Sequence, residues 1–492
     1  MTEQDRSSTP EQEADAGGRR GSGRRGSARR AGPLAVVGRT LVLGVSLAVF
    51  GTCGFTWYTY HSLAAGITTS HALDPVKQAA PPRPTDSAGH LDTSVNVLLI
   101  GLDSRRDQDG RSLPQAVLEN DLHAGSSSDI GGYNTNTLIL MHIPANGGKV
   151  EAFSIPRDDY VDLVNAPGQP KLGKHKIKEA YDRAKYQAVN QLTAQGVTDP
   201  VELEHRSREA GRQATLLTVQ NMLQVPIDHF AEVNLIGFYH VAQALGPIEV
   251  CLKKAVKDPI VARTSTRVGH GSGADFPAGP QFLNAAQSLS FVRQRYNLPN
   301  GDLDRTQRQQ AFLAGVTKQL RDQGVFGDLG RMQGLLDAVK QDVVIDDSWK
   351  LLDFAQQVPD LTGGNVEFHT LGSVLSQPDL GGSDGDVNIV DVAKIRAQVK
   401  QTIGDTDSTP PAPPAGPSDV PSASPNATAN ANANADSTAS ATPGAGSSTG
   451  GPTTDTPAPD SGATATASPT SGTIADEFSG SAVDGGSIPC VY

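Results

Sequence analysis

The chain has 492 residues and a formal net charge of -12, so we expect no general affinity for nucleic acid and predict no nucleic-acid partner. Its length would allow two or three domains. The last hundred residues consist mostly of Ser, Thr, Ala, Pro, Gly and Asn, and the first thirty are also poor in apolar residues. Such segments cannot bury enough apolar surface to fold alone. We therefore expect one globular unit, at residues 95–404.

Residues 34–60 are predicted to form a transmembrane helix. No charged residue occurs from Thr40 to Tyr60, and a helix of about 20 such residues crosses a bilayer. Three aromatic residues gather at its far end, and seven arginines precede it: Trp57, Tyr58, Tyr60 and Arg19, Arg20, Arg24, Arg25, Arg29, Arg30, Arg39. The positive-inside rule then places residues 1–33, a basic disordered tail, in the cytoplasm and all later residues outside. The alternative is a cleaved signal peptide, but bulky aromatic residues stand where small ones are expected.

The remaining segments outside the globular unit are predicted from composition. Residues 61–94 contain Pro-Pro-Arg-Pro and no apolar periodicity, which indicates a stalk. Residues 405–470 are expected to be a disordered linker, and residues 471–492 a C-terminal tail. Cys251 and Cys490 would both lie in an oxidising compartment, where they either form a disulfide or remain two free thiols. Cys53 falls inside the predicted membrane helix.

The globular unit reads as strands that alternate with helices. SVNVLLIGLDSR predicts a buried strand, and NTLILMHI and KVEAFSI predict neighbouring strands joined by a tight turn. Further strands are expected at HFAEVNLIGF, PIEVCL and NVEFHTL. Helices are expected over 174–224 with a new start at 198–200, over 284–295, over 304–323 with Asp304 as N-cap, and within 327–358. This order predicts an α/β fold, an α-β-α sandwich with a central mixed sheet.

Two arginine clusters indicate an anion site. In FSIPRDDY, Arg157 and Asp158 follow a strand and a proline, and the planar guanidinium group suits a phosphate. Asp158 would act as a base or hold the arginine, whereas Asp159 is expected to be solvated. The alternative for each single arginine is a surface ion pair.

The second cluster is RQRYNLPNGDLDRTQRQQ. Arg305, Arg308 and Gln309 are spaced i, i+3 and i+4, so they share a helix face. Like charges on one face repel unless an anion or an acid lies between them. This spacing predicts a polyphosphate pocket, which Arg293 and Arg295 can approach from the preceding helix.

Three weaker signals surround these clusters. Asp103 follows a buried strand and would bind a divalent cation such as Mg²⁺ or begin a turn. Asn134 and Asn136 precede the next strand and would face a metal, an anion or the backbone. The lysines of KHKIKEAY stand at an expected helix start, where a cation is unfavourable unless an anion is near. A solvated helix face is the alternative.

The segments NVLLIGLDSR, SIPRD, KIKEAY, VNLIGF and FVRQR with DLDRTQRQQ occur in the order found in the LytR–CpsA–Psr enzymes of Gram-positive cell walls. The chain resembles this family over about residues 95–320, and the membrane anchor also fits. The resemblance implies an extracytoplasmic, single-pass membrane protein with the partners polyprenyl-pyrophosphate-linked glycopolymer, peptidoglycan and membrane lipid. It implies a phosphotransferase that joins the glycopolymer to peptidoglycan through a phosphodiester, with Mg²⁺ or another divalent cation as cofactor.

The resemblance also assigns roles to individual residues. The implied catalytic residues are Arg157, Asp158, Asp302 and Arg305. The implied substrate-binding residues are Arg105, Lys176, Arg293, Arg295, Arg308 and Gln309, and the implied metal ligands are Asp103 and Asn136. The family's Arg-Ser-Asp-Thr is Asn134-Thr135-Asn136-Thr137 here, so a metal-binding carboxylate is missing; either Asp129 supplies it or the metal binds more weakly. The family's Lys-Ile-Asn reads Lys176-Ile177-Lys178.

Two other functions stay open at this point. A pyrophosphatase would act on the same lipid carriers with water as the acceptor. A non-catalytic protein would hold lipid-linked precursors or regulate the envelope. The amide at Asn136, in place of the family's carboxylate, keeps this second alternative open.

Overall fold

The computed structural model of the chain describes residues 66–81, 94–128, 132–145, 148–261, 271–325, 328–349, 366–382, 384–408, 483–484 and 488–492. Across these ranges, no helix has the length and apolar character needed to cross a membrane. The predicted membrane helix at 34–60, the basic tail before it and Asp129 lie outside the described residues. Half of the predicted stalk and most of the predicted linker lie outside them as well.

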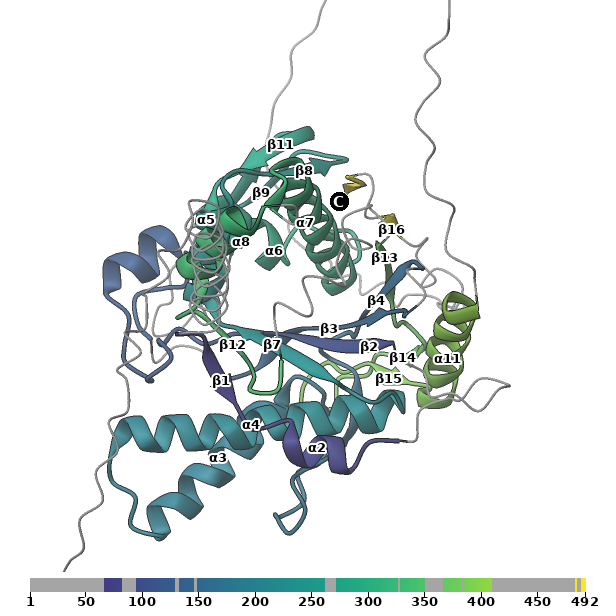
Figure 1. Cartoon of the computed structure of the whole chain (residues 1–492). Helices are drawn as coiled ribbons and strands as arrows, with labels where there is room; N and C mark the ends of the chain where they lie inside the picture. Colours follow the sequence, from purple (N-terminus) through teal and green to yellow (C-terminus); the bar gives the residue numbers. More distant parts are fainter. Residues whose placement is uncertain are drawn as a thin grey trace, which may run out of the picture. The chain divides into compact units, whose positions relative to one another are not determined.

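The central layer is a mixed sheet with eight strands in the described part of the chain (Figure 1). Their order is β1 (Thr68–Ser70), β12 (Val343–Asp346), β7 (His229–Val233), β2 (Val95–Leu102), β3 (Thr135–Ile143), β4 (Val150–Ser154), β13 (Val366–Thr370) and β16 (Val483–Asp484). β3 runs antiparallel to β2 and β4, whereas β7 is parallel to β2 and β13 is parallel to β4. The predicted α/β class with a central mixed sheet is confirmed.

Helices cover both faces of this sheet (Figure 1). One face packs on α3 (Glu179–Ala194) and α4 (Pro200–Leu223), with α2 (Asp74–Gln78) and α11 (Val392–Ser408) at its margins. The other face meets α7 (Asp302–Asp322), which packs in turn on α5 (Leu235–Leu245), α6 (Ala285–Arg293) and α8 (Leu329–Val339). In β2, Leu98 and Ile100 face the first layer, whereas Val97 and Leu99 face the second. Burial on two faces explains the continuous apolar sequence of this strand.

Small sheets and one π-helix complete the described fold. The π-helix η1 spans Val117–Asp121. The small sheets pair β5 (Tyr160–Leu163) with β6 (Gly173–Lys176), β9 (Val256–Asp258) with β10 (Ala274–Phe276), β14 (Val374–Ser376) with β15 (Ile389–Val390), and β8 (Ile248–Leu252) with both β11 (Gly279–Leu283) and β17 (Cys490–Val491).

Two predicted elements have the wrong bounds. The strand expected to run through HFAEVNLIGF ends at Val233, because Asn234 caps α5 by accepting a hydrogen bond from the Gly237 amide (2.9 Å). The helix expected from residue 174 starts only at Glu179, because Gly173–Lys176 pairs with β5.

The predicted N-cap of α7 at Asp304 is also wrong. The helix begins at Asp302, after Gly301 with a φ of 55°, a backbone conformation that glycine adopts without strain. Asp304 instead accepts hydrogen bonds from the amide (2.8 Å) and the side chain (3.1 Å) of Asn300. This earlier start places Asp302 one turn before Arg305.

Part of the predicted stalk belongs to the folded domain. Residues 68–70 form β1, which pairs with β12, and Val76 of α2 is fully buried. The strand β12 lies in the 327–358 segment, where only helices were expected. The three polar residues of β1 carry no apolar pattern, so their place in the sheet depends on a partner that is distant in sequence.

The C-terminal residues return to the domain. β17 adds a parallel strand to β8, and a disulfide joins Cys251 to Cys490. Of the two alternatives for these cysteines, the disulfide is confirmed. Arg308 of α7 donates a hydrogen bond to the Tyr492 backbone carbonyl, so the C-terminal strand also contacts the helix that begins at Asp302.

We expect Cys490→Ser to lower the free energy of unfolding by about 2–5 kcal/mol, because the disulfide restricts a long loop in the unfolded chain. The two cysteines are 239 positions apart. Denaturant unfolding without reductant measures the effect. The double variant Cys251→Ser/Cys490→Ser is the control and should be no less stable than the single one. A single variant as stable as the wild type contradicts the prediction.

Candidate functional site

The predicted site residues meet at one edge of the central sheet. Asp103 follows the end of β2, Asn136 stands near the start of the antiparallel β3, and Arg157 follows the end of β4. The start of α7 brings Asp302 and Arg305 to the same edge. Residues that are up to about 200 positions apart in sequence are therefore neighbours in the fold.

Asp302 is the carboxylate shared by the arginines of this cluster. Its Oδ1 lies 3.2 Å from Nη2 of Arg157 and 3.1 Å from Nη1 of Arg305. Both arginine side chains are only 5% exposed. A buried charge is costly unless it is paired, and here one carboxylate serves two guanidinium groups. Asp158 is a second carboxylate at Arg157, but it is shared with Lys178, so the three cations outnumber the two carboxylates.

Asn136 connects the arginines to Asp103. Its Nδ2 donates to Oδ2 of Asp103 at 2.8 Å, and its Oδ1 accepts from Nη1 of Arg157 at 2.8 Å. The Asn136 backbone carbonyl accepts from Nη2 of Arg305 at 3.3 Å. The amide thus uses both its donor and its acceptor within the protein.

Asp158 lies between Arg157 and two lysines. Its Oδ2 is 3.3 Å from Nε of Arg157, and its Oδ1 is 2.5 Å from Nζ of Lys178 and 3.9 Å from Nζ of Lys176. Burial by itself raises the pKa of Asp158, but Arg157 and Lys178 outweigh it, so the pKa is lowered. Asp158 is therefore ionised at neutral pH.

Several buried polar atoms of the cluster have no hydrogen-bond partner among the described residues. They are Oδ1 of Asp103, Nε and Nη1 of Arg105, Nε and Nη2 of Arg157, Oδ1 of Asp302 and Nε of Arg305. Folded proteins satisfy nearly all buried polar atoms, so such a concentration calls for an explanation. Nε and Nη2 of Arg157 and Oδ1 of Asp302 take part in ion pairs within the cluster. Nε and Nη1 of Arg105 and Nε of Arg305 are guanidinium nitrogens without a hydrogen bond among the described residues, and the group that would satisfy them is an anion.

The electrostatics agree with this interpretation. Burial, together with Arg157, lowers the pKa of Arg305 to about 9. Burial also lowers the pKa of Arg105, which the nearby Arg293 lowers further. Both groups remain charged at neutral pH, but at a cost in free energy. A bound anion removes this cost because it supplies the missing negative charge.

Arg308 does not join the cluster. It is fully buried, and its Nη1 donates to Gln294 at 2.7 Å while Nε donates to the Tyr492 carbonyl. Burial lowers its pKa to about 10. Acceptors within the protein relieve part of the repulsion expected between Arg305 and Arg308, while Nη2 of Arg308 is buried without a hydrogen bond among the described residues. A role for Arg308 in substrate binding stays a prediction.

The remaining predicted residues lie around the cluster. Arg293 donates to the backbone carbonyl of Leu122 at 2.8 Å, and Gln309 donates to a carbonyl of α6 at 3.4 Å. Arg295 is 56% exposed, with Nε 3.8 Å from Asp302. Of these three, Arg295 has the side chain most accessible to a ligand. The substrate-binding roles of all three stay predictions.

Asp159 is not solvated, contrary to the sequence-based expectation. The residue is fully buried and accepts a hydrogen bond from Nδ2 of Asn388 at 3.1 Å. Burial raises its pKa well above the ordinary value for Asp. The Asn388 amide also donates to the carbonyl of Asp158. Asn388 is distant in sequence and carries no local signal, so the sequence analysis missed it.

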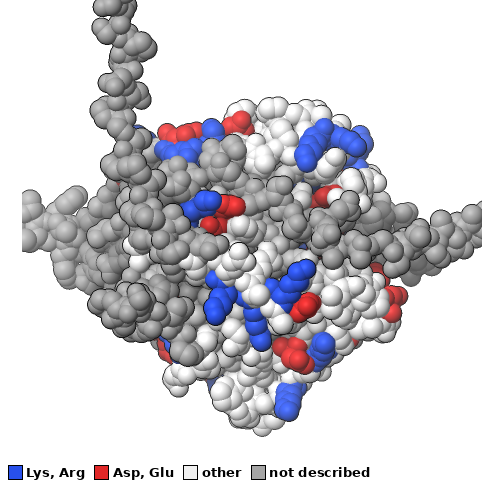
Figure 2. Space-filling view, turned by 90° about the vertical axis from the view of Figure 1, so that its right-hand side faces the viewer, with Lys and Arg blue, Asp and Glu red and all other residues white. Residues whose placement is uncertain are grey.

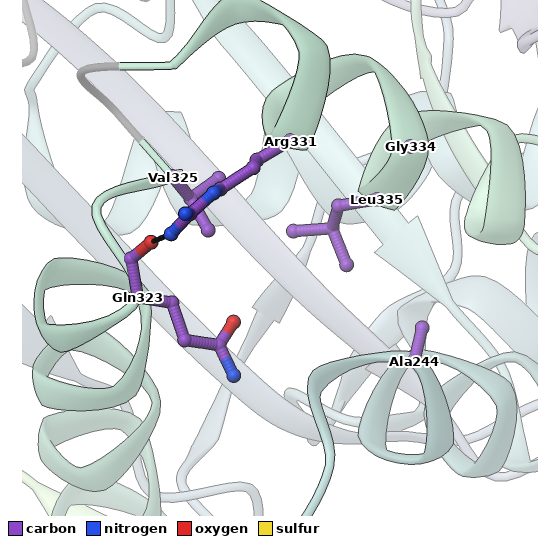
Figure 3. A pocket seen from close by; sticks show the side chains of 6 residues that line it. All are labelled: Ala244, Gln323, Val325, Arg331, Gly334 and Leu335. Carbon is purple, nitrogen blue, oxygen red and sulfur yellow. Dashed lines mark hydrogen bonds between the residues drawn. The ribbon is translucent and has the colours of Figure 1, made fainter.

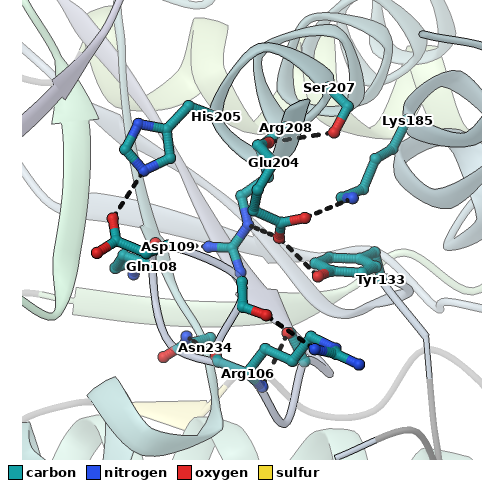
Figure 4. A network of polar contacts seen from close by, with 12 residues as sticks. Arg106, Gln108, Asp109, Tyr133, Lys185, Glu204, His205, Ser207, Arg208 and Asn234 are labelled. Carbon is teal, nitrogen blue, oxygen red and sulfur yellow. Dashed lines mark hydrogen bonds and ion pairs between the residues drawn. The ribbon is translucent and has the colours of Figure 1, made fainter. Parts of the chain in front are cut away.

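A polar network below the site holds the loop that carries Asp103 and Arg105 (Figure 4). Glu204 of α4 accepts from Tyr133 (2.6 Å), Lys185 (2.8 Å) and Arg208 (2.7 Å). Arg208 also donates to the carbonyl of Asp107 at 2.9 Å. The network links the helix layer to the loop after β2 and to Tyr133, which precedes β3. The sequence analysis did not single out these residues.

The predicted metal ligands fit a cation only in part. Oδ1 of Asp103 is buried and has no hydrogen-bond partner in the described ranges, and one carboxylate with substrate phosphates is a common Mg²⁺ arrangement. The Oδ1 atom of Asn136 already accepts a hydrogen bond from Arg157. Asp103 is therefore the residue that would hold the ion.

A separate pocket lies between α5, α8 and the end of α7 (Figure 3). Its lining residues are Ala244, Gln323, Val325, Arg331, Gly334 and Leu335. The charged residue among them, Arg331, donates to the Gln323 carbonyl. The chemistry of this lining does not suit a polyphosphate. On the molecular face in Figure 2, basic side chains form small groups with acidic ones nearby, and the described residues show no continuous basic surface there.

The fold and the buried cluster define an α/β protein with arginines gathered at one edge of its sheet. The family model described as the LytR_cpsA_psr family matches residues 57–400, which is well over half of the chain. The chain therefore belongs to the LytR–CpsA–Psr family.

Three similar proteins show how much of the chain individual relatives match. The cell wall biosynthesis protein LcpA of Corynebacterium glutamicum is 36% identical over 319 residues, which cover 65% of this chain and 57% of LcpA. The chain thus matches little more than half the length of that relative. The polyisoprenyl-teichoic acid–peptidoglycan teichoic acid transferase TagU of Bacillus licheniformis is 25% identical over 63% of this chain and 79% of its own. The crystal structure of TagV of B. subtilis superposes with a TM-score of 0.44 at 18% identity, covering 65% of this chain and 98% of TagV.

We expect the stability of the protein to fall as pH rises above about 4, because Asp159 keeps a proton when folded and loses it when unfolded. The loss continues up to the raised pKa of the folded state. Asp159→Asn should remove this part of the pH dependence and raise the free energy of unfolding at pH 8 by about 1 kcal/mol or more. Denaturant unfolding at pH 5 and pH 8 tests this. The prediction is wrong if the free energy of unfolding changes by the same amount between pH 5 and pH 8 in the wild type and in the variant.

Proposed function

We propose that the chain is a membrane-anchored phosphotransferase that attaches a polyprenyl-pyrophosphate-linked glycopolymer to peptidoglycan through a phosphodiester. The observation that carries the proposal is a set of buried guanidinium nitrogens that form no hydrogen bond in the described residues, namely Nε and Nη1 of Arg105 and Nε of Arg305. A pyrophosphate group is an anion of the right chemistry for them, since its oxygens accept paired hydrogen bonds from guanidinium groups. The names of LcpA and TagU, which concern cell wall biosynthesis and teichoic acid transfer, support the proposal.

In the proposed reaction, a hydroxyl oxygen of the acceptor attacks the phosphorus that bears the glycopolymer. The bond from this phosphorus to the bridging oxygen breaks, and polyprenyl phosphate leaves. Arg157 and Arg305 would bind the phosphate oxygens and stabilise the charge that develops on them, while Asp302 keeps both arginines in place. A cation held by Asp103 would neutralise further negative charge on the phosphates.

Asp158 is our candidate to receive the proton of the acceptor hydroxyl. It is ionised at neutral pH and lies next to Arg157, which would bind the phosphate. Its lowered pKa makes it a weak base. Phosphoryl transfer depends mainly on positioning and on stabilisation of charge, so proton transfer to the base is a minor part of the proposed catalysis.

The anchor and the lipid site are part of the same proposal. A helix at 34–60 would hold the domain at the outer membrane face, where lipid-linked substrates occur. Apolar side chains on the α7 side of the sheet remain only partly buried, among them Val95, Leu99 and Met141. A prenyl chain needs an apolar surface of this kind next to the phosphate site, and Leu99 lies on the strand that leads to Asp103.

The test is transfer from a short-chain prenyl-pyrophosphate glycan to peptidoglycan fragments by the full chain with Mg²⁺, measured by mass spectrometry of the product. Arg157→Ala and Arg305→Ala should each lower the rate by about 10²- to 10³-fold, because each removes a donor aimed at the developing charge. Arg331→Ala is the control, since that side chain is 62% exposed and lies in a different pocket.

The other outcomes of this assay identify the alternative functions. Free glycan phosphate without a linked product would favour a pyrophosphatase, with water as the acceptor. Tight donor binding without any turnover would favour a non-catalytic binding protein. Either result contradicts the transferase proposal, provided that circular dichroism shows the wild type to be folded.

We expect Asn136→Asp to create a second cation ligand beside Asp103. Without Mg²⁺ two effects oppose each other, because repulsion replaces the hydrogen bond to Asp103 while the new carboxylate gains an ion pair with Arg157. With millimolar Mg²⁺ the repulsion is relieved, so the variant should show a recovery of stability that is larger than any effect of Mg²⁺ on the wild type. Thermal unfolding with Mg²⁺ and with EDTA measures both effects. Adding Asp103→Asn should abolish the recovery, and equal Mg²⁺ effects in wild type and variant would contradict the prediction.

A further inference from the structure

A polar groove runs along the exposed side of α3, next to the arginine cluster. Its lining residues are Asn134, Lys176, Lys178, Glu179, Asp182, Arg183 and Tyr186. The last four are spaced i, i+3, i+4 and i+7 on α3, so they form one face of that helix. The groove is therefore a continuous surface formed by one helix face, the end of β6 and the segment before β3.

The charged groups of this groove already have partners in the protein. Glu179 accepts from Arg183 at 2.8 Å, and Asp182 accepts from the Tyr133 amide at 3.1 Å. Lys178 is paired with Asp158. The groove thus differs from the arginine cluster, where guanidinium nitrogens of Arg105 and Arg305 form no hydrogen bond in the described residues. The three cations and two carboxylates of the lining are close to neutral as a set, so the groove offers a polyanion less than the arginine cluster does.

The chemistry of the groove suits a neutral glycan. Tyr186 is 67% exposed, which leaves an aromatic ring open to contact the apolar C–H face of a sugar. Carboxylates and the amide of Asn134 can accept hydrogen bonds from sugar hydroxyls, and lysines can donate to hydroxyl and acetamido oxygens.

Asp158 connects the groove to the arginine cluster. One of its carboxylate oxygens faces Lys178 and Lys176, which line the groove, and the other faces Arg157 of the cluster. A hydroxyl that reaches the phosphate from the groove passes this carboxylate. The groove also lies on the side of the sheet that packs on α3, whereas the partly buried apolar side chains face α7.

We propose that this groove binds the acceptor, a hydroxyl-rich glycan strand of peptidoglycan, and presents its hydroxyl to Asp158. The inference rests on the proposed transferase function and extends it by locating the acceptor. Donor and acceptor then approach the arginine cluster from opposite sides of the sheet, so neither blocks the other. Tyr186 is the residue that determines affinity for the acceptor, while Asp158 lies at the point where the two substrates meet.

The experiment compares Tyr186→Ala with Phe282→Ala in the full chain purified in detergent. Phe282 is a matched control because it is an equally exposed aromatic residue, also 67% exposed, on β11. Initial rates of transfer are measured against the concentration of peptidoglycan fragments and, separately, of the prenyl-pyrophosphate glycan. Direct binding of a phosphate-free peptidoglycan fragment is measured by equilibrium dialysis.

We expect Tyr186→Ala to raise KM for the acceptor by about 3- to 10-fold, which is the range for loss of one aromatic contact. Its kcat and its KM for the donor should stay within about twofold of the wild type, and binding of the phosphate-free fragment should weaken by the same factor as KM rises. Phe282→Ala should match the wild type in every measurement.

Two results would overturn the acceptor groove. One is an unchanged acceptor KM in Tyr186→Ala while the wild type transfers. The other is a raised KM for the donor instead, which would assign the groove to the glycopolymer. Failure of the transferase proposal is distinct, because it appears as absence of product in the wild type. In that case only the equilibrium dialysis tests the groove. Equal binding of the phosphate-free fragment by the wild type and by Tyr186→Ala, or no binding by either protein, would reject it.

Discussion

The site depends on the shortage of negative charge around two buried guanidinium groups. Asp302 contacts both Arg157 and Arg305 at about 3 Å. The second carboxylate at Arg157, Asp158, is shared with Lys178, so two carboxylates face three cations. The protein tolerates this cost because the groups are fixed from several directions. Arg157 is held by Asn136, Asp158 and Asp302 together, and α7 is held by the C-terminal strand through Arg308. A site preorganised in this way does not need to rearrange when an anion arrives.

The sheet topology explains why these groups meet. An antiparallel β3 between β2 and β4 brings the ends of both strands to one edge, which is where Asp103 and Arg157 emerge. The sequence allowed this much to be predicted, because an apolar run followed by a polar residue marks the end of a buried strand. The proximity of Arg157 to Arg305 could be expected only from the family resemblance, since no local pattern links the end of a strand to a helix that begins far downstream.

The errors of the sequence analysis have a common physical origin. Asp159 looked solvated because its neighbours are polar, yet Asn388 covers it from a distant segment. β1 has no apolar pattern and exists because β12 provides hydrogen-bond partners. In each case the deciding partner comes from elsewhere in the chain, so propensity and spacing near the residue could not reveal it.

The position of Asp158 between Lys178 and Arg157 has a consequence for the order of events. While Lys178 is paired with it, Asp158 is a weak base because positive neighbours lower its pKa. Burial and Arg157 also lower the pKa of Lys178. The arginine that would bind the phosphate therefore repels Lys178 and weakens the ion pair between Lys178 and Asp158. In the proposed reaction, an acceptor hydroxyl that displaced Lys178 would take away the closest cation of Asp158 and make the carboxylate more basic. The proposed base would then become stronger only when the acceptor is in place, which would disfavour transfer to water in its absence.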